Sequence, residues 1–188
     1  MTSAIEIGSG DVVTFWREAG SEKWFTKDAA FDRAIADRFG ELHAKAAAGH
    51  LADWASTPEG ALALVLLLDQ FSRNLYRNDA RAYAQDEMAR SCAGEAIQRG
   101  DDLGFIPVQR QFLYMPFEHS EALADQDYAV ELMGSLENFE ETAGLGAWAE
   151  KHRDIIRRFG RFPHRNALLG RESTPDEAEF LKRPGAGF

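Results

Sequence analysis

Residues 57–77, TPEGALALVLLLDQFSRNLYR, constrain the fold of this chain more than any other stretch. Thr57 can cap a helix N-terminus, and Pro58 then falls at the first helical position, where no helical partner exists for the missing N–H. Every residue from 61 to 68 is apolar, which predicts a helix buried on all sides at the centre of a helical protein. Polar residues follow at three- and four-residue spacings along one side, namely Asp69, Gln70, Arg73, Asn74 and Arg77. The helix is therefore expected to run from the core into the wall of a pocket.

Apolar residues at helical spacing, with glycines after several of the runs, predict further helices on both sides of this one. The expected helices are a short one capped by Asp11 and ended by Gly20, then 29–48, 57–77, 80–99, one that begins at Pro107 and is kinked or broken at Pro116, 120–136, 146–159 and 174–182. No stretch alternates apolar and polar residues over strand length. Because the connections are short, the sequence predicts an all-α fold of about eight helices in stacked helical hairpins, with no sheet.

The 188 residues are expected to form a single domain over residues 1–188, with a loose tail from about residue 184. The single cysteine excludes an internal disulfide and fits a reducing compartment. The N-terminus lacks the pattern of a signal peptide, and the longest apolar run has eight residues, whereas about 20 are needed to span a bilayer. We therefore expect a soluble, cytoplasmic protein that does not enter membranes.

The formal net charge of −10 argues against nucleic-acid binding. Residues 151–171 nevertheless carry seven basic residues against the single acid Asp154, so this segment is expected to form an anion-attracting patch on an acidic body. Its centre, the loop RFGRFPHRNALLGR, is stiffened by Pro163 and should display Arg161, His164, Arg165 and Asn166 from a rigid turn. The alternative is a structural C-terminal lock in which Asn166 bonds the backbone.

Three of the five histidines are candidates for chemistry, and His43 and His50 are expected at the surface. His152 falls on the apolar face of its helix and is either a hydrogen-bonded core residue or part of a site. His119 lies in PFEHSE, and His164 lies in FGRFPHRN. Together with a carboxylate such as Asp69 or Glu121 these residues could bind a metal, but no two are at i, i+4 and no HExxH occurs. We therefore assign no metal ligand and no cofactor.

Arginine side chains supply planar donors suited to carboxylates and phosphates. Arg73, Arg77, Arg157, Arg161 and Arg165 are the candidates. The pairs Asp69–Arg73 and Asp154–Arg158 are alternatively ordinary ion pairs at i, i+4. For Asp154–Arg158 this interpretation is favoured, whereas Asp69–Arg73 extends a buried helix and is equally compatible with a functional network.

The motifs LDQFSRNLYR, FLYMPFEHSE and HRDIIRRFGRFPHRNALLGRESTPDEAEFL resemble the bacterial family known as domain of unknown function 924. The likeness runs from VVTFW near the start to Leu181. It implies an all-helical fold related to tetratricopeptide repeats, and it implies no activity. The residues of the family motifs are Asp69, Gln70, Arg73, Asn74, Arg77, His119, Glu121, Gln126, His152, Arg161, His164, Arg165, Asn166 and Arg171.

The function that the sequence favours is binding of a small carboxylate- or phosphate-bearing ligand in one polar cleft, where the helix 57–77, PFEHSE and FGRFPHRN meet. His119 and His164 are the candidates for acid–base catalysis. The predicted ligand-binding residues are Asp69, Gln70, Arg73, Asn74, Arg77, Glu121, Gln126, His152, Arg161, Arg165 and Asn166. A noncatalytic tetratricopeptide-like module that binds a peptide or a partner protein is the first alternative. A metal-assisted hydrolase using His119, His152 and His164 is the second, and polar residues that only lock the fold are the third.

Overall fold

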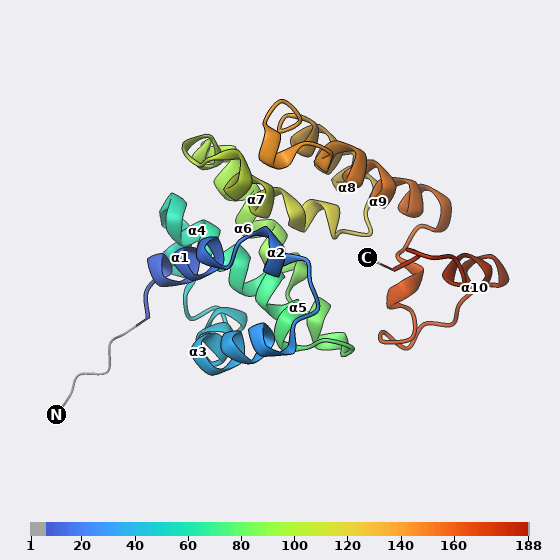
Figure 1. Cartoon of the computed structure of the whole chain (residues 1–188), viewed down its shortest axis with the longest axis horizontal. Coiled ribbons are helices and arrows are strands. Elements are labelled where there is room, and N and C mark those ends of the chain that lie inside the picture. Colours follow the sequence, from blue (N-terminus) through green and yellow to red (C-terminus); the bar gives the residue numbers. More distant parts are fainter. Residues whose placement is uncertain (1–6, 188) are drawn as a thin grey trace. The chain divides into compact units, whose positions relative to one another are not determined.

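The computed structural model describes residues 7–187 of the chain, so most of the N-terminal stretch judged to lack a signal peptide lies outside it. Within the described residues all regular elements are helical, which confirms the predicted all-α class (Figure 1). The chain divides into two compact units. Unit 1 comprises the residues up to 77 and residues 81–116, and unit 2 comprises residues 78–80 and 117–188. The single domain and the tetratricopeptide-like stacking stay predictions.

Unit 1 is built around the predicted central helix. In chain order its helices are α1 (Ser9–Ala19), α2 (Ser21–Trp24), α3 (Ala29–Ala47), η1 (Ala52–Ser56), α4 (Pro58–Val65), η2 (Leu66–Phe71), α5 (Ser72–Leu75), η3 (Ala80–Tyr83), α6 (Asp86–Arg99), η4 (Asp101–Gly104) and α7 (Pro107–Glu118). The first residue of η3 and the last two residues of α7 belong to unit 2. Helices α1 and α6 pack against α4, while α3 packs against η2 and α5. All residues from 61 to 68 are buried, as expected for a helix that is apolar all round.

The central helix begins as predicted but is not uniform. Thr57 Oγ1 accepts a hydrogen bond from Gly60 N at 3.1 Å, which is the expected N-cap. Gly60 is required here, because a Cβ atom on it would lie 2.1 Å from the carbonyl oxygen of Trp54. After Val65 the α-helix widens into the π-helix η2, which includes Asp69 and Gln70. A π-helical turn has no distinct signature in apolar spacing, and such turns are frequent at functional sites.

Three details differ from the helices expected in the sequence. Asp11 is the third residue of α1 rather than its cap, and its carboxylate accepts a hydrogen bond from Gly8 N at 2.9 Å. The helix expected over 80–99 is divided by a turn at residues 84–85 into η3 and α6. Helix α7 continues through Pro116 to Glu118, so it is not broken there, while the alternative prediction of a kink stays a prediction. Pro116 lies near the end of the helix, where its missing N–H removes one hydrogen bond and few helical turns follow.

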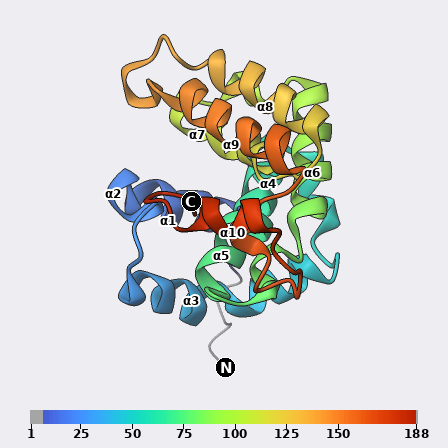
Figure 2. The same cartoon turned by 90° about the vertical axis from the view of Figure 1, so that its right-hand side faces the viewer.

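Unit 2 contains α8 (Leu123–Gly134), η5 (Glu140–Thr142), α9 (Leu145–Phe159), η6 (Pro163–Arg165) and α10 (Pro175–Leu181). Helices α8 and α9 form a hairpin and lie side by side in both views (Figure 1 and Figure 2). Ile155 and Ile156 of α9 form a small core with Phe162, and Phe159 and Phe180 pack against it. The core therefore joins α9 to the segment that follows it.

Local hydrogen bonds are present at the start of α10 and in the residues that follow it. Thr174 caps α10 as predicted, in a reciprocal capping box with Glu177. The tail from about residue 184 was predicted to be loose, and this stays a prediction; within it, Ala186 N donates to Arg183 O, and Ala186 is buried. Phe188 lies outside the described residues. Among the helices that the structure describes, none is long and apolar enough to cross a membrane.

Candidate functional site

The first group of predicted site residues lies on the central helix of unit 1, around Arg73. Arg73 Nη1 lies 3.0 Å from Asp69 Oδ1, and it donates to the Asp69 carbonyl oxygen at 2.9 Å. The same guanidinium binds both carboxylate oxygens of Asp86, at 3.0 and 3.1 Å. Burial disfavours the charged guanidinium, but the Asp69 and Asp86 carboxylates outweigh it and raise the pKa of Arg73. Arg73 is thus a charged group with two internal carboxylate partners.

The next turn of the same helix is bound to α3. Asn74 Nδ2 donates to Asp32 Oδ1 at 2.7 Å, and Arg77 Nη2 donates to the same oxygen at 2.9 Å. Gln70 donates to the Asp69 carboxylate and contacts the sulfur of Met115 at 3.3 Å. The sequence analysis did not single out the partner residues Asp32 and Asp86. Each is an acid in the first turn of a helix, a position where acids are common without any further role.

His43 was expected at the surface, but it is buried in unit 1 with 3% of its surface exposed. Its Nε2 lies 2.8 Å from Ser72 Oγ, and the Ser72 hydroxyl donates to the Leu68 carbonyl oxygen at 2.6 Å. His43 Nε2 is therefore the donor to Ser72. Burial lowers the pKa of His43, so the ring is neutral near pH 7.

The second group of predicted residues lies in unit 2 and fastens the segment after α9. The Glu121 carboxylate accepts a hydrogen bond from Phe162 N at 2.8 Å and two from Arg171 at 2.7 and 2.9 Å. Burial opposes ionisation, but the bonds from Arg171 and Phe162 outweigh it and hold the pKa of Glu121 below its usual range. Arg171 Nε also donates to Asn166 Oδ1 at 3.0 Å. Glu121 therefore ties the turn before α8 to the loop beyond α9.

Arg161 belongs to the same set of bonds. Its guanidinium forms a bidentate pair with Glu177 at 2.6 and 2.7 Å, and this pairing lowers the pKa of Glu177 to about 2. Asn166 Nδ2 donates to Ser173 Oγ at 3.0 Å. These are the contacts of a structural lock, although Asn166 bonds side chains rather than the backbone.

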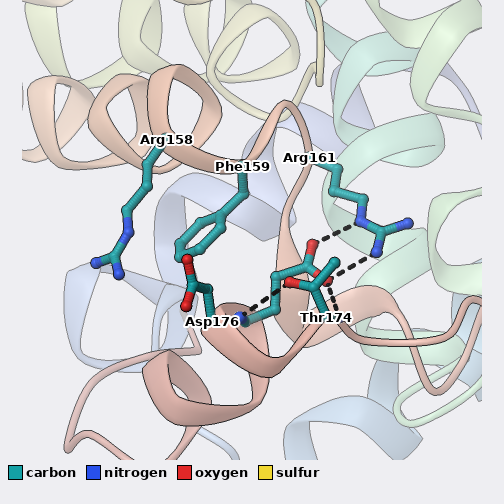
Figure 3. A pocket seen from close by; sticks show the side chains of 6 residues that line it. Arg158, Phe159, Arg161, Thr174 and Asp176 are labelled. Atoms are coloured by element: carbon teal, nitrogen blue, oxygen red, sulfur yellow. Dashed lines mark hydrogen bonds and ion pairs between the residues drawn. The ribbon is translucent and has the colours of Figure 1, made fainter.

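Arg161 and Glu177 also line an open groove of about 410 Å³ between the end of α9 and the start of α10 (Figure 3). The dashed lines in Figure 3 show that the guanidinium of Arg161 is occupied by Glu177. Arg158 stacks its guanidinium 4.6 Å from the centre of the Phe159 ring, and Asp176 lies on the facing turn. The pairing Asp154–Arg158 that the sequence favoured is replaced by a contact of Asp154 with Arg157 at 4.0 Å.

Gln126, assigned to ligand binding through the family resemblance, is buried and holds the turn that follows α7. Its Nε2 donates to the carbonyl oxygens of Glu118 and Ser120, both at 2.6 Å. Its described contacts are those of a residue that shapes the backbone next to His119.

The remaining predicted residues lie in unit 2, where His152, His164 and Arg165 contact the ring of Phe162 and His119 acts electrostatically on His152. We call the following set the histidine cluster: Glu118, His119, His152, Phe162, His164 and Arg165. The imidazole rings of His152 and His164 lie 5.8 and 5.6 Å from the Phe162 ring, and the Arg165 guanidinium lies 4.5 Å from its centre. Arg165 is buried, whereas His119 and His164 are partly exposed. The loop with Pro163 thus places His164 and Arg165 on one aromatic ring, next to a histidine of α9.

His152 is held from two sides. Its Nδ1 lies 3.1 Å from the carbonyl oxygen of Trp148 and 3.4 Å from Glu118 Oε1. Only 3% of His152 and 2% of Glu118 is exposed. Burial lowers the pKa of His152 to about 3, against the raising effect of the Trp148 carbonyl, and the charges of His119, Arg165 and His164 lower it further. His152 is therefore a neutral imidazole near pH 7, beside the Glu118 carboxyl group, Arg165 and two further histidines.

A metal centre finds no support in this arrangement. Among residues 7–187, no three side chains of His, Cys, Asp or Glu are placed to hold one metal ion. The three histidines do influence one another electrostatically in unit 2, but their donor atoms do not form a set of ligands. Asp69, the carboxylate considered with them, belongs to unit 1, and each unit is described by itself.

The fold and the site define a class of protein: a helical chain of two compact units. In each unit, arginine side chains pair with buried carboxylates. The chain belongs to the bacterial proteins of unknown function DUF924, whose family profile matches residues 12–185. A similar solved structure is that of protein of unknown function ATU0120 from Agrobacterium tumefaciens. It shares 48% sequence identity over 93% of this chain and 96% of that one, with a TM-score of 0.88. No curated protein matches the chain.

Proposed function

We propose that the protein binds a small anion, a carboxylate or a phosphate, at the histidine cluster of unit 2, with histidine acid–base chemistry beside it. The observation that carries the proposal is the gathering of Arg165, His119 and His164 around a buried, neutral His152. The Arg165 guanidinium disfavours a proton on His152. A bound anion would offset that effect, so binding of the anion would favour proton uptake by His152.

The proposal assigns the ligand contacts to Arg165, His119 and His164 of the histidine cluster. Arg165 stacks on Phe162, which orients its guanidinium, and its charge also lowers the pKa of Glu121. His119 and His164 are partly exposed. Arg73, Arg77 and Arg161 are not included, because each binds a carboxylate of the protein in a bidentate or paired contact.

The acid–base part of the proposal rests on the different surroundings of the histidines. His119 and His164 are partly exposed and are assigned to donate to the ligand, as histidines commonly do near neutral pH. His152 is buried and neutral, and is assigned to accept a proton. Two histidine environments of this kind suit a reaction in which one group gives a proton and another takes one.

The test is calorimetric titration of the protein with inorganic phosphate and with acetate. We expect saturable binding that weakens about tenfold or more in Arg165→Gln, because a charge-assisted hydrogen bond to the anion is lost. Arg157→Gln is the matched control, since Arg157 lies in the same segment but is exposed and pairs with Asp127 at 3.2 Å. Equal binding by both variants, or none by the wild type, would refute the proposal, provided that circular dichroism shows both variants folded.

The peptide-binding alternative has less support. A peptide-binding module would need a large apolar groove. The apolar pocket described in unit 1, beside Trp16, Trp24 and Phe112, has a volume of about 20 Å³. That volume is about one water molecule, too small for a side chain.

A further inference from the structure

We propose that the open groove between the end of α9 and the start of α10 is a second binding site, which takes a small amino carboxylate: a molecule with one carboxylate, one ammonium group and a short apolar chain between them. Arg158 binds the carboxylate, Asp176 binds the ammonium group, and the ring of Phe159 contacts the chain. The groove and the histidine cluster have no residue in common, so this inference does not rest on the function proposed above.

The groove has the size of a small-molecule site. Its volume is about 410 Å³, and ligand pockets of proteins span about 300–1,000 Å³. In Figure 3 the side chains of Arg158 and Phe159 extend from the end of α9, and the side chain of Asp176 extends towards them from the first turn of α10. All three residues belong to unit 2. A ligand that enters this groove therefore meets both of its walls.

The wall formed by α9 carries an exposed guanidinium, that of Arg158. Asp154, four residues earlier, is at the spacing of a helical ion pair, but its carboxylate contacts Arg157 at 4.0 Å instead. The described contact of Arg158 is with the ring of Phe159, and the centre of this ring lies 4.6 Å from the guanidinium carbon. Stacking on an aromatic ring orients the guanidinium without occupying its N–H donors. Arg158 therefore has donors to offer to a carboxylate of a ligand.

The wall formed by α10 carries an exposed carboxylate, that of Asp176. The next carboxylate along the chain, that of Glu177, is bound by Arg161 and by Thr174 N. Asp176 has no such partner among residues 7–187, and within that range it forms no ion pair with Arg158. Two opposite charges thus line one groove without neutralising each other, and a ligand between them can bind both.

The balance of charge in the groove determines the class of ligand. Its lining side chains include two cations, Arg158 and Arg161, and two anions, Asp176 and Glu177, so their charges sum to zero. A simple anion is repelled by Asp176 and a simple cation by Arg158, whereas an amino carboxylate carries both charges and none in total. A phosphate monoester in place of the carboxylate adds further negative charge. The groove therefore favours an amino carboxylate over an amino phosphate.

The ring of Phe159 supplies the apolar contact. It packs against the core of Ile155, Ile156 and Phe162, and its centre lies 5.1 Å from that of the Phe180 ring. Because this packing already holds the ring in place, little side-chain entropy is lost when a ligand binds to it. Carbon atoms of the ligand that lie on the ring are removed from water, which favours binding.

The first experiment titrates the ¹⁵N-labelled protein with glycine, 4-aminobutanoate and 6-aminohexanoate, which differ in the separation of their two charges. Amide signals are followed by NMR. We expect saturable shifts at residues 158–161 and 174–177 for at least one of the three, with a Kd on the order of 1 mM, because the groove is open to water. Butanoate, butylammonium and phosphoethanolamine should bind about fivefold more weakly than that amino carboxylate, since each lacks one charge or adds one.

Two results of this titration would refute the site. One is the absence of saturable shifts at these residues with all three amino carboxylates, and the other is equally tight binding of butanoate or butylammonium. Both results leave the function proposed above standing, because shifts at the histidine cluster are recorded separately in the same spectra.

Neutral variants test each charge. Arg158→Gln and Asp176→Asn should each weaken binding of the amino carboxylate about fivefold, and both should fold normally because the two side chains are exposed. Arg157→Gln and Glu179→Gln are the matched controls, since they remove exposed charges of the same two helices outside the groove, and they should bind as the wild type does. Unchanged binding in Arg158→Gln or Asp176→Asn would overturn the role of that residue.

Charge reversal separates recognition of the ligand from an effect on the fold. Arg158→Glu alone and Asp176→Arg alone each leave two like charges facing the ligand, so each should bind more weakly than the corresponding neutral variant. The double variant has one charge of each sign again, in reversed order, and should recover binding of 6-aminohexanoate. A double variant that is folded by circular dichroism and does not recover binding would contradict the proposed pairing of charges. If it does not fold, the neutral variants decide the outcome.

Discussion

At the scale of single residues, several arginines of this protein bind its own carboxylates, among them Arg73, Arg161 and Arg171. Asp69 is fully buried. Arg73 forms ion pairs with both Asp69 and Asp86. A buried ion pair contributes little compared with an apolar pair of the same shape. Removing one partner alone, however, leaves a charge without compensation in a medium of low polarity. A buried ion pair is therefore detected by the loss of stability when one of its two side chains is truncated.

Truncation of Arg73 is expected to be strongly destabilising. Arg73→Ala should lower the free energy of unfolding by about 3 kcal/mol, because Asp69 and Asp86 lose their common cation. Urea unfolding followed by circular dichroism measures the change. Arg157→Ala is the control, because its partly exposed pair with Asp127 should contribute less than about 1 kcal/mol. Similar losses in the two variants would contradict the assignment.

The buried histidines predict a loss of stability in mild acid. The folded-state pKa of His152 is about 3, below the unfolded value of about 6.5, so its contribution is full above pH 6.5. It is lost as the pH falls from 6.5 towards 3, by up to ~1.4 kcal/mol per pH unit, because unfolding takes up a proton. Urea unfolding at pH 7, 6 and 5 should show a shallower decline for His152→Gln than for the wild type. Parallel declines would show that His152 does not contribute.

At the scale of elements, the central helix has a closely packed first turn and a π-helical turn in its middle. Its first turn approaches the carbonyl of Trp54 so closely that only glycine fits at position 60. Its middle is the π-helix η2, where Asp69 and Gln70 are buried among leucines. The widened turn precedes the residues that bind Asp86 and Asp32. The local irregularity and the polar network therefore belong to one stretch of chain.

Two glycine substitutions distinguish a steric clash of the new Cβ atom from the higher helix propensity of alanine. Gly60→Ala should reduce the free energy of unfolding by about 2–3 kcal/mol, because its Cβ would overlap the Trp54 carbonyl oxygen. Gly40→Ala, within α3 and with open space at its Cβ, should increase it by about 0.5–1 kcal/mol. Thermal or urea unfolding gives both values. A neutral Gly60→Ala would mean that the start of α4 can move away from Trp54.

At the scale of the whole molecule, the uneven charge of the chain is balanced locally. Residues 151–171 were expected to form an anion-attracting patch, but four of their seven basic residues pair with acids of unit 2. Arg153 and Arg157 pair with Asp127, Arg161 pairs with Glu177, and Arg171 pairs with Glu121. The sequence shows the excess of positive charge in this segment. It does not show that acids from α8, α10 and the turn before α8 lie beside it.

The sequence predicted elements better than contacts. The N-cap at Thr57, the capped helix α10 and the apolar run 61–68 follow from local rules, and the structure confirms them. The exposure of His43 is wrong, and α7 is not broken at Pro116. Each outcome depends on what surrounds the residue: the end of a helix for Pro116 and Ser72 for His43. A pattern of apolar residues along the chain does not show these surroundings.

By itself, the amino-acid sequence determined the helical class, the buried central helix and the polar residues worth examining, because helix capping and apolar periodicity are properties of short segments. Only the tertiary structure decided which polar residues neutralise one another and which gather as the histidine cluster. Apart from Asp69, which lies four residues from Arg73, the carboxylate partners of Arg73, Arg77, Arg161 and Arg171 come from 13 to 50 residues away in the chain. Pairing over such separations depends on how the helices pack. Only this packing determines which charges are buried and which partners they meet.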